Sequence, residues 1–174
     1  MALHSLSLSK VSRLAGALLA IGLACLSSLG AQTASAQRAS PFANFLGNWQ
    51  GSGEVVGSDG NRERIRCRAK YEISEKGDAL TQSLLCASAS YRVDISSYVV
   101  ASGQGVQGYW REATRQVQGS MTGQIANGRF DGTVAGPAFT AQLSLRAADD
   151  RQTVDIRPQG GDVARVEVQL SRRM

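Results

Sequence analysis

The sequence predicts an all-β protein: an antiparallel up-and-down β-barrel of about ten strands, preceded by a short N-terminal helical turn. Two observations carry this prediction. Apolar and polar residues alternate with period two along most of the chain after Gly47, as they do in strands with one dry and one wet face. Turn-forming residues interrupt these runs at short intervals, which favours hairpins between sequential strands and a closed or nearly closed barrel.

The helical turn is expected directly before the first strand. Ser40 can cap it, and Pro41 suits its first position because proline lacks the N–H group that would be unpaired there. Phe42, Phe45 and Leu46 fall on one face at this spacing. A turn this short is unstable alone, so we expect its apolar face to dock on the barrel.

The strands and their turns follow along the chain. Alternation is clearest in four segments, at 64–71, 116–125, 139–146 and 166–170. Glycine, asparagine and aspartate mark the turns between strands, at 58–61, 76–77, 126–128, 149–150 and 159–162.

Two cysteines provide a test of the hairpin pattern. If Lys76 and Gly77 form a two-residue turn, residues whose numbers sum to 153 lie opposite each other, and Cys67 and Cys86 satisfy this condition. Opposed Cα atoms of antiparallel strands lie ~4.5–5.5 Å apart, within the range of a disulfide. We therefore expect a Cys67–Cys86 disulfide; two buried free thiols are the alternative.

The N-terminal segment resembles a secretory signal peptide. Lys10 and Arg13 precede an apolar stretch at 14–26, and a small-x-small motif follows it. The apolar stretch is shorter than the ~20 residues that span a bilayer. We expect a cleaved signal peptide at 1–36, a single barrel domain at 37–174, and a periplasmic or secreted protein that does not span the membrane after cleavage.

Cleavage would leave 138 residues, which is enough for one domain with its own core. The remaining 17 basic and 14 acidic residues give a mild positive charge, so we do not expect a nucleic-acid partner. The one histidine, His4, and the third cysteine, Cys25, lie in the signal segment. The remaining pair of cysteines fits a disulfide in an oxidising compartment.

A helical turn that leads into Gly47 and Trp49, at the start of the first strand, resembles the lipocalins and the wider calycin group. The resemblance implies that Trp49 closes one end of the barrel. It also implies that an arginine near the last strand, either Arg172 or Arg173, packs over this tryptophan.

The glycine-rich stretch at 47–53 and the later segment at 108–111 are similar to nitrobindin-like haem barrels. That family ligates iron with histidine, and none remains after cleavage, so we expect no cofactor. Over most of 42–172 the pattern resembles a family of small exported alphaproteobacterial proteins that has no assigned activity.

The inner face of the predicted barrel is the candidate ligand site. Its glycines leave either a cavity for one small ligand or bends at barrel corners that neighbouring aromatic side chains fill. Tyr71 and Gln82 are opposed in the register above, and they either orient a polar end of the ligand or satisfy each other. We assign five residues to the site: Tyr71, Gln82, Trp110, Met121 and Phe139.

Alternate residues of one segment form a basic ridge on the outer face, at ~6.6–7 Å intervals. Its members are Arg62, Arg64, Arg66 and Arg68, followed by Lys70. The ridge either contacts an envelope protein or an anionic polymer, since arginine binds phosphate and carboxylate groups bidentately, or it is a solvated surface that discourages aggregation.

Catalysis and metal binding find little support in the sequence. The mature chain has no histidine base, no serine in a nucleophile elbow and few of the usual metal ligands. Glu112 is in phase with Trp110 and is expected near the barrel mouth without a carboxylate partner. We therefore expect an exported, non-catalytic barrel that binds a small apolar or amphipathic ligand.

Other functions remain open. The protein is alternatively an envelope interaction protein, such as a hydrolase inhibitor, or a structural envelope component. A barrel inverted into the outer membrane is the least favoured reading, because its lipid-facing residues would include many Gly and Ala and no clear aromatic girdles.

Overall fold

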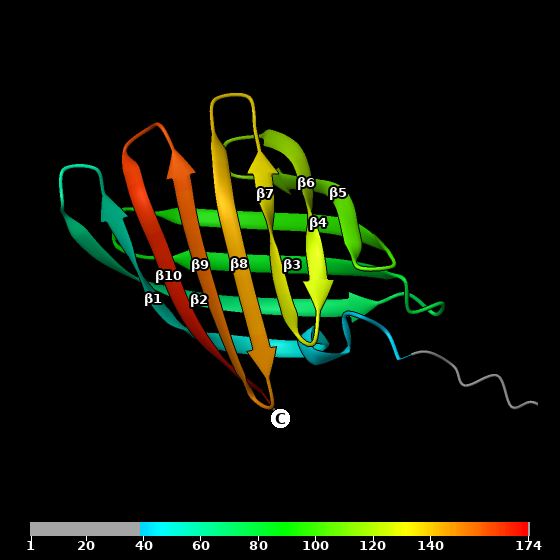
Figure 1. Ribbon diagram of the computed structural model, residues 1–174. Helices are drawn as coiled ribbons and strands as arrows, with labels where there is room; N and C mark the ends of the chain where they lie inside the picture. Colours follow the sequence, from blue (N-terminus) through cyan, green and yellow to red (C-terminus); the bar gives the residue numbers. More distant parts are fainter. Residues whose placement is uncertain (1–38, 174) are drawn as a thin grey trace, which may run out of the picture. The chain divides into compact units, whose positions relative to one another are not determined.

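Ten antiparallel strands form a closed barrel in the computed structural model, which describes residues 39–173 (Figure 1). The predicted signal peptide at 1–36 lies outside the described residues. Within 39–173, no helix is long and apolar enough to cross a membrane. The elements are η1 (Ala43–Phe45), β1 (Gly47–Gly57), β2 (Arg62–Ile73), β3 (Ala79–Ala87), β4 (Arg92–Ser102), β5 (Gly105–Glu112), β6 (Val117–Ala126), β7 (Arg129–Ala135), β8 (Thr140–Ala148), β9 (Arg151–Gln159) and β10 (Val163–Arg172).

Each strand pairs with the next along the chain, and β1 pairs with β10 to close the barrel. The register between β1 and β10 runs from Trp49 opposite Arg172 to Gly57 opposite Val163, with one irregularity after Val56. The predicted fold class is therefore confirmed: an all-β, up-and-down antiparallel barrel with one short helical turn.

One end of the barrel, which we call the closed end, is covered by η1. Phe42 and Phe45 are 1% and 2% exposed, and the Phe45 ring lies 6.1 Å from that of Tyr71 on β2. Trp49 is also buried, and its indole N–H donates to the Phe45 carbonyl at 2.7 Å. The Arg172 guanidinium lies 4.3 Å from the centre of the Trp49 ring. Arg172, rather than Arg173, is thus the arginine that packs over the tryptophan.

The prediction for Leu46 is wrong. It is 47% exposed, whereas Phe42 and Phe45 are buried. The reason is the type of helix: η1 is a three-residue 3-10 turn, in which side chains three apart are eclipsed. The next residue is rotated away from that face. Ser40 does not cap η1 as predicted, because the N-cap residue is Phe42 and no side chain caps it. The Ser40 Oγ instead accepts the Phe42 N–H at 3.2 Å and donates to the Gly77 carbonyl at 2.6 Å.

The β2–β3 hairpin has the predicted register and a different turn. Cys67 lies opposite Cys86, with a Cα–Cα distance of 4.1 Å, and the two form the disulfide inside the barrel. The strands end at Ile73 and begin again at Ala79, so the connection is longer than two residues. Extra residues are added symmetrically about Lys76 and Gly77, which is why the register is unchanged. The pairing of β2 with β3 begins at Arg66 opposite Ala87, so Arg64 is not opposed by a residue of β3.

Candidate functional site

Three of the five predicted site residues meet at the closed end. Tyr71, Gln82 and Met121 line a cavity of about 30 Å³ beside η1. This volume is room for a water molecule, since one needs about 10–15 Å³ of such space. It is far below the roughly 300–1,000 Å³ of a ligand pocket. The closed end of the barrel is therefore packed, with a small cavity whose lining is mainly apolar and includes Tyr71, Gln82 and Ser97.

The structure does not bring Trp110 and Phe139 to this cavity. Their rings lie 5.7 Å apart, next to the β7–β8 turn, and the Trp110 indole N–H donates to the Ala135 carbonyl at 3.2 Å. They belong to the opposite end of the barrel, which we call the mouth. The turns at 58–61, 88–91, 113–116, 136–139 and 160–162 surround the mouth.

Neighbouring backbones occupy the space beside two inward-facing glycines, which therefore leave no cavity. A Cβ atom on Gly119 would overlap the Ala135 carbonyl of β7, and one on Gly108 would overlap the Tyr98 carbonyl of β4. Neighbouring backbones therefore approach these glycines so closely that no side chain fits. A cavity beside the glycines was one of the two sequence interpretations, and these close contacts leave no room for one at Gly108 and Gly119. A larger residue at Gly119 would displace the backbone, so it cannot serve to fill the interior.

A cluster of uncharged polar side chains lies beside the small cavity. Gln152 donates through Nε2 to the Tyr71 hydroxyl at 2.9 Å, and Ser97 donates to Gln82 Oε1 at 2.8 Å. Gln82 lies opposite Tyr71, as the register predicts, and reaches its hydroxyl at 3.5 Å. Burial raises the pKa of Tyr71 to about 12, against the opposing effect of the two glutamines. Tyr71 is therefore neutral at ordinary pH.

Ser97 and Gln152 were not among the predicted site residues. Ser97 is 5% exposed and Gln152 is 1% exposed. Both stand in the inward phase of their strands, where Val99 and Val154 are the apolar neighbours. A polar residue at a dry position is the signal that could have identified them.

The inner wall near the mouth is apolar and only partly covered. Most core residues at the closed end are buried, whereas these aliphatic side chains retain contact with solvent. Five come from the adjacent strands β1, β10, β9, β8 and β7, and the sixth, Leu84, comes from β3. Six residues form this aliphatic ring: Val55, Leu84, Val134, Leu143, Val154 and Val166.

Glu112 stabilises a turn and does not face an open site. The side chain is 3% exposed, and its carboxylate accepts the N–H groups of Asp94, Thr114 and Arg115 at 2.7–3.1 Å. Burial raises the pKa of Glu112, but these donors together outweigh burial and lower the pKa to about 2. The carboxylate thus ties β4 to the β5–β6 turn.

Replacing Glu112 with alanine is expected to lower the free energy of unfolding by about 1.5–3 kcal/mol, because half-buried N–H groups lose a charged acceptor. The folded pKa lies below the ordinary value of 4.5, so the stabilisation is full above pH 4.5 and is lost as the pH falls towards 2. Urea unfolding should show that the free energy of unfolding falls less between pH 7 and pH 3 in Glu112→Gln than in the wild type. The exposed Glu75→Gln is the control, and an unchanged pH effect in Glu112→Gln would contradict this role.

The basic ridge on β2 is exposed, as predicted, and is partly paired. Arg62 forms an ion pair with Glu54 at 2.8 Å, and Arg64 reaches Ser52 at 3.4 Å. Arg66 and Arg68 lie opposite neutral residues on both neighbouring strands. Arg68 also lines a shallow outer groove of about 390 Å³, together with Lys70, Arg173 and one acidic residue, Asp94.

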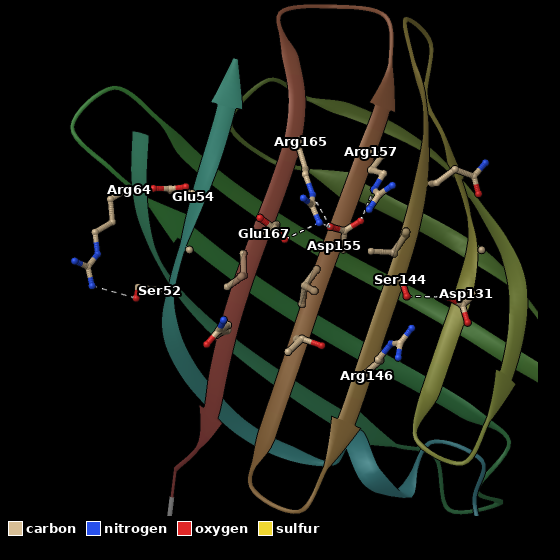
Figure 2. A pocket seen from close by; sticks show the side chains of 18 residues that line it. Ser52, Glu54, Arg64, Asp131, Ser144, Arg146, Asp155, Arg157, Arg165 and Glu167 are labelled. Carbon is tan, nitrogen blue, oxygen red and sulfur yellow. Dashed lines mark hydrogen bonds and ion pairs between the residues drawn. The ribbon is translucent and has the colours of Figure 1, made fainter. Parts of the chain in front are cut away.

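A concavity of about 870 Å³ lies on the outer face of β1 and β7–β10, with Arg64 of β2 at its lining. Figure 2 shows Asp155 there between Arg157 and Arg165, at 2.8 and 2.5 Å. Arg165 also pairs with Glu167 at 2.6 Å. Burial raises the pKa of Asp155, but its two arginines outweigh this and keep the pKa below its usual value. Four arginines and four acidic residues line the groove, so its charges neutralise one another and leave no net charge for a ligand.

No group of three or more histidine, cysteine, aspartate or glutamate side chains is placed to hold a metal ion in the part of the chain that the structure describes. The features of the interior that a ligand could contact are the small uncharged cavity and the aliphatic ring.

Two solved structures have a similar fold. Rv2717c from M. tuberculosis matches with a TM-score of 0.63 and 12% sequence identity, over 78% of this chain and 99% of that chain. The S-type phycobiliprotein lyase CpeS from Guillardia theta matches with a TM-score of 0.52 and 13% identity, over 76% of this chain and 90% of that chain. No protein-family model and no curated protein matches the chain. At these identities the likeness concerns the fold alone, a closed antiparallel β-barrel.

Proposed function

We propose that this protein is a non-catalytic binding protein that takes a small apolar or amphipathic ligand into its barrel through the mouth. The aliphatic ring is the observation that carries the proposal. Half-buried aliphatic side chains on β3 and on the five adjacent strands β1 and β7–β10 leave apolar surface in contact with water inside a concave wall. A ligand that covers this surface gains about 25 cal/mol for each Å² removed from water.

The mouth is the entrance that the fold favours. η1, Trp49 and Arg172 cover the closed end, so a ligand that entered there would have to displace buried aromatic rings. Met121 lies between the two regions, because it lines the small cavity and is opposite Val134 of the aliphatic ring. Methionine is unbranched and adapts its shape, so a ligand can extend from the ring towards the cavity as this side chain moves.

We also propose that the protein acts in the periplasm or outside the cell. The predicted signal peptide at 1–36, the disulfide, and the resemblance to small exported alphaproteobacterial proteins support this location.

Blocking the mouth is expected to abolish binding. Leu143→Trp places a bulky indole among the residues of the aliphatic ring. Gln142→Trp adds an indole to the outer face of the same strand and serves as the control. Titration with Nile red, an uncharged dye that fluoresces in apolar surroundings, should give saturable binding to the wild type and to Gln142→Trp. Leu143→Trp should show little enhancement. Equal dye binding by both variants would place the dye outside the barrel and contradict the proposal.

The basic ridge favours a second candidate, contact with an envelope protein or an anionic polymer. Arg66 and Arg68 are exposed beside neutral residues, and Arg68 borders the groove that also holds Lys70 and Arg173. The two candidates respond to different changes. If the protein binds a ligand in the barrel, Leu143→Trp should abolish ligand binding and Arg66→Gln should leave it unchanged. If it acts through the basic ridge, Arg66→Gln should weaken binding of the partner and Leu143→Trp should not.

A further inference from the structure

The buried amide of Gln152 is only half satisfied. Its Nε2 donates to Tyr71, and its Oε1 is buried with no hydrogen-bond partner. Among the residues that the structure describes, one polar atom of a side chain that is 1% exposed is thus left unpaired.

Stability does not account for this arrangement. An unpaired polar group in the core costs free energy, and an apolar pair of the same shape would avoid that cost. The two residues come from β2 and β9, so the fold brings together two inward polar positions that apolar residues could occupy. Buried polar groups that weaken the core are typical of sites kept for function.

The surroundings of this pair carry no charge. In the part of the chain that the structure describes, the inner wall has ionisable acidic or basic groups only at its two ends. Glu63 and Glu112 accept backbone N–H groups at the mouth, and Arg172 donates to the carbonyls of Asn44 and Asp149 at the closed end. A ligand charge brought beside Tyr71 would be desolvated without a partner.

We propose that Tyr71 and Gln152 bind the uncharged polar end of an otherwise apolar ligand, and that a hydroxyl group is the end they fit. This rests on the proposed binding function and defines its ligand class. A hydroxyl both donates and accepts, so it can donate to Gln152 Oε1 and accept a hydrogen bond from the hydroxyl of Tyr71, to which Gln152 Nε2 already donates at 2.9 Å. Tyr71 lines the small cavity next to Met121, so the apolar remainder of the ligand extends from there towards the aliphatic ring.

The raised pKa of Tyr71, about 12, is consistent with a site for an uncharged group. The phenol keeps its proton across the physiological range, so the site presents the same uncharged donor at every ordinary pH.

A matched series of displacement titrations tests the proposal. Nile red is bound to the purified protein and displaced by 1-octanol, by octanoate, or by nonane, in which a methyl group replaces the hydroxyl. The variants are the wild type and Tyr71→Phe/Gln152→Leu, which removes both polar partners at nearly constant shape. We expect the double variant to bind 1-octanol about tenfold more weakly and to bind nonane as tightly as the wild type does. Octanoate should bind more weakly than 1-octanol to the wild type.

The outcomes separate this inference from the function on which it rests. The double variant should melt at or above the temperature of the wild type, which shows that a loss of octanol binding is not a loss of fold. Equal octanol affinity in both proteins, or a preference for octanoate, would overturn the hydroxyl site and leave interior binding intact. No saturable binding of Nile red to the wild type would overturn both.

Discussion

Replacing Trp49 with alanine is expected to lower the free energy of unfolding by about 3–5 kcal/mol, a typical loss for a buried tryptophan. The ring is 1% exposed, its N–H is bonded to Phe45 at 2.7 Å, and Arg172 covers one of its faces. The substitution leaves a cavity between η1 and the ends of β1 and β10. It also removes the aromatic face on which the arginine packs. Urea unfolding followed by far-UV circular dichroism measures the loss.

A second aromatic residue serves as the control. Tyr109 is 61% exposed on the outer face of β5, so Tyr109→Ala should change the free energy of unfolding by less than about 0.5 kcal/mol. Arg172→Lys should lie between the two, because lysine keeps the charge but loses the planar group that contacts several carbonyls. If Trp49→Ala and Tyr109→Ala were equally stable, Trp49 would have no role in holding the closed end.

Removal of the disulfide is expected to lower the free energy of unfolding by about 3 kcal/mol, the chain-entropy value for a loop of this length. Cys67 and Cys86 are 19 residues apart in the sequence and directly opposed in the barrel. The double variant Cys67→Ala/Cys86→Ala and the reduced wild type should unfold at similar, lower urea concentrations than the oxidised wild type.

Intact mass provides the matching check on the exported protein. The chain recovered from the periplasm or the medium should begin at Gln37 and should gain mass at two cysteines only when it is reduced before alkylation. Alkylation of both cysteines without reduction, in protein that still shows full stability, would contradict the disulfide. A mass that includes residues 1–36 would contradict the predicted cleavage.

Strand number, register and the disulfide were predictable because they depend on period-two patterning and on turns. One opposed pair, Cys67 and Cys86, fixed the β2–β3 register even though the turn is longer than expected. Register depends on where the turn is centred, and lengthening both sides equally leaves it unchanged. Leu46 was predicted incorrectly because an i, i+3, i+4 face assumes an α-helix, whereas η1 is a 3-10 turn.

The site was less predictable. The alternation of apolar and polar residues assigns side chains to the inner face. It does not show how far along the barrel axis each side chain lies. Trp110 was therefore grouped with Tyr71, although it lies nearer the mouth. Gln152 escaped notice for another reason: it reaches Tyr71 across the barrel, between strands far apart in the sequence. Pairs of this kind depend on the tilt and closure of the sheet, which no local pattern contains.

The pairing of β1 with β10 has a consequence for how the chain reaches its native state. The two strands that close the barrel, β1 and β10, are separated by nearly the whole length of the domain. The barrel therefore cannot close until β10 is available for pairing. Until then, β1 and β9 each present a row of unpaired backbone groups, and such rows invite association with other chains. Closure over so long a separation is also slow, because the loop entropy is lost before the contacts form. Ring closure is thus the step at which productive folding competes with aggregation.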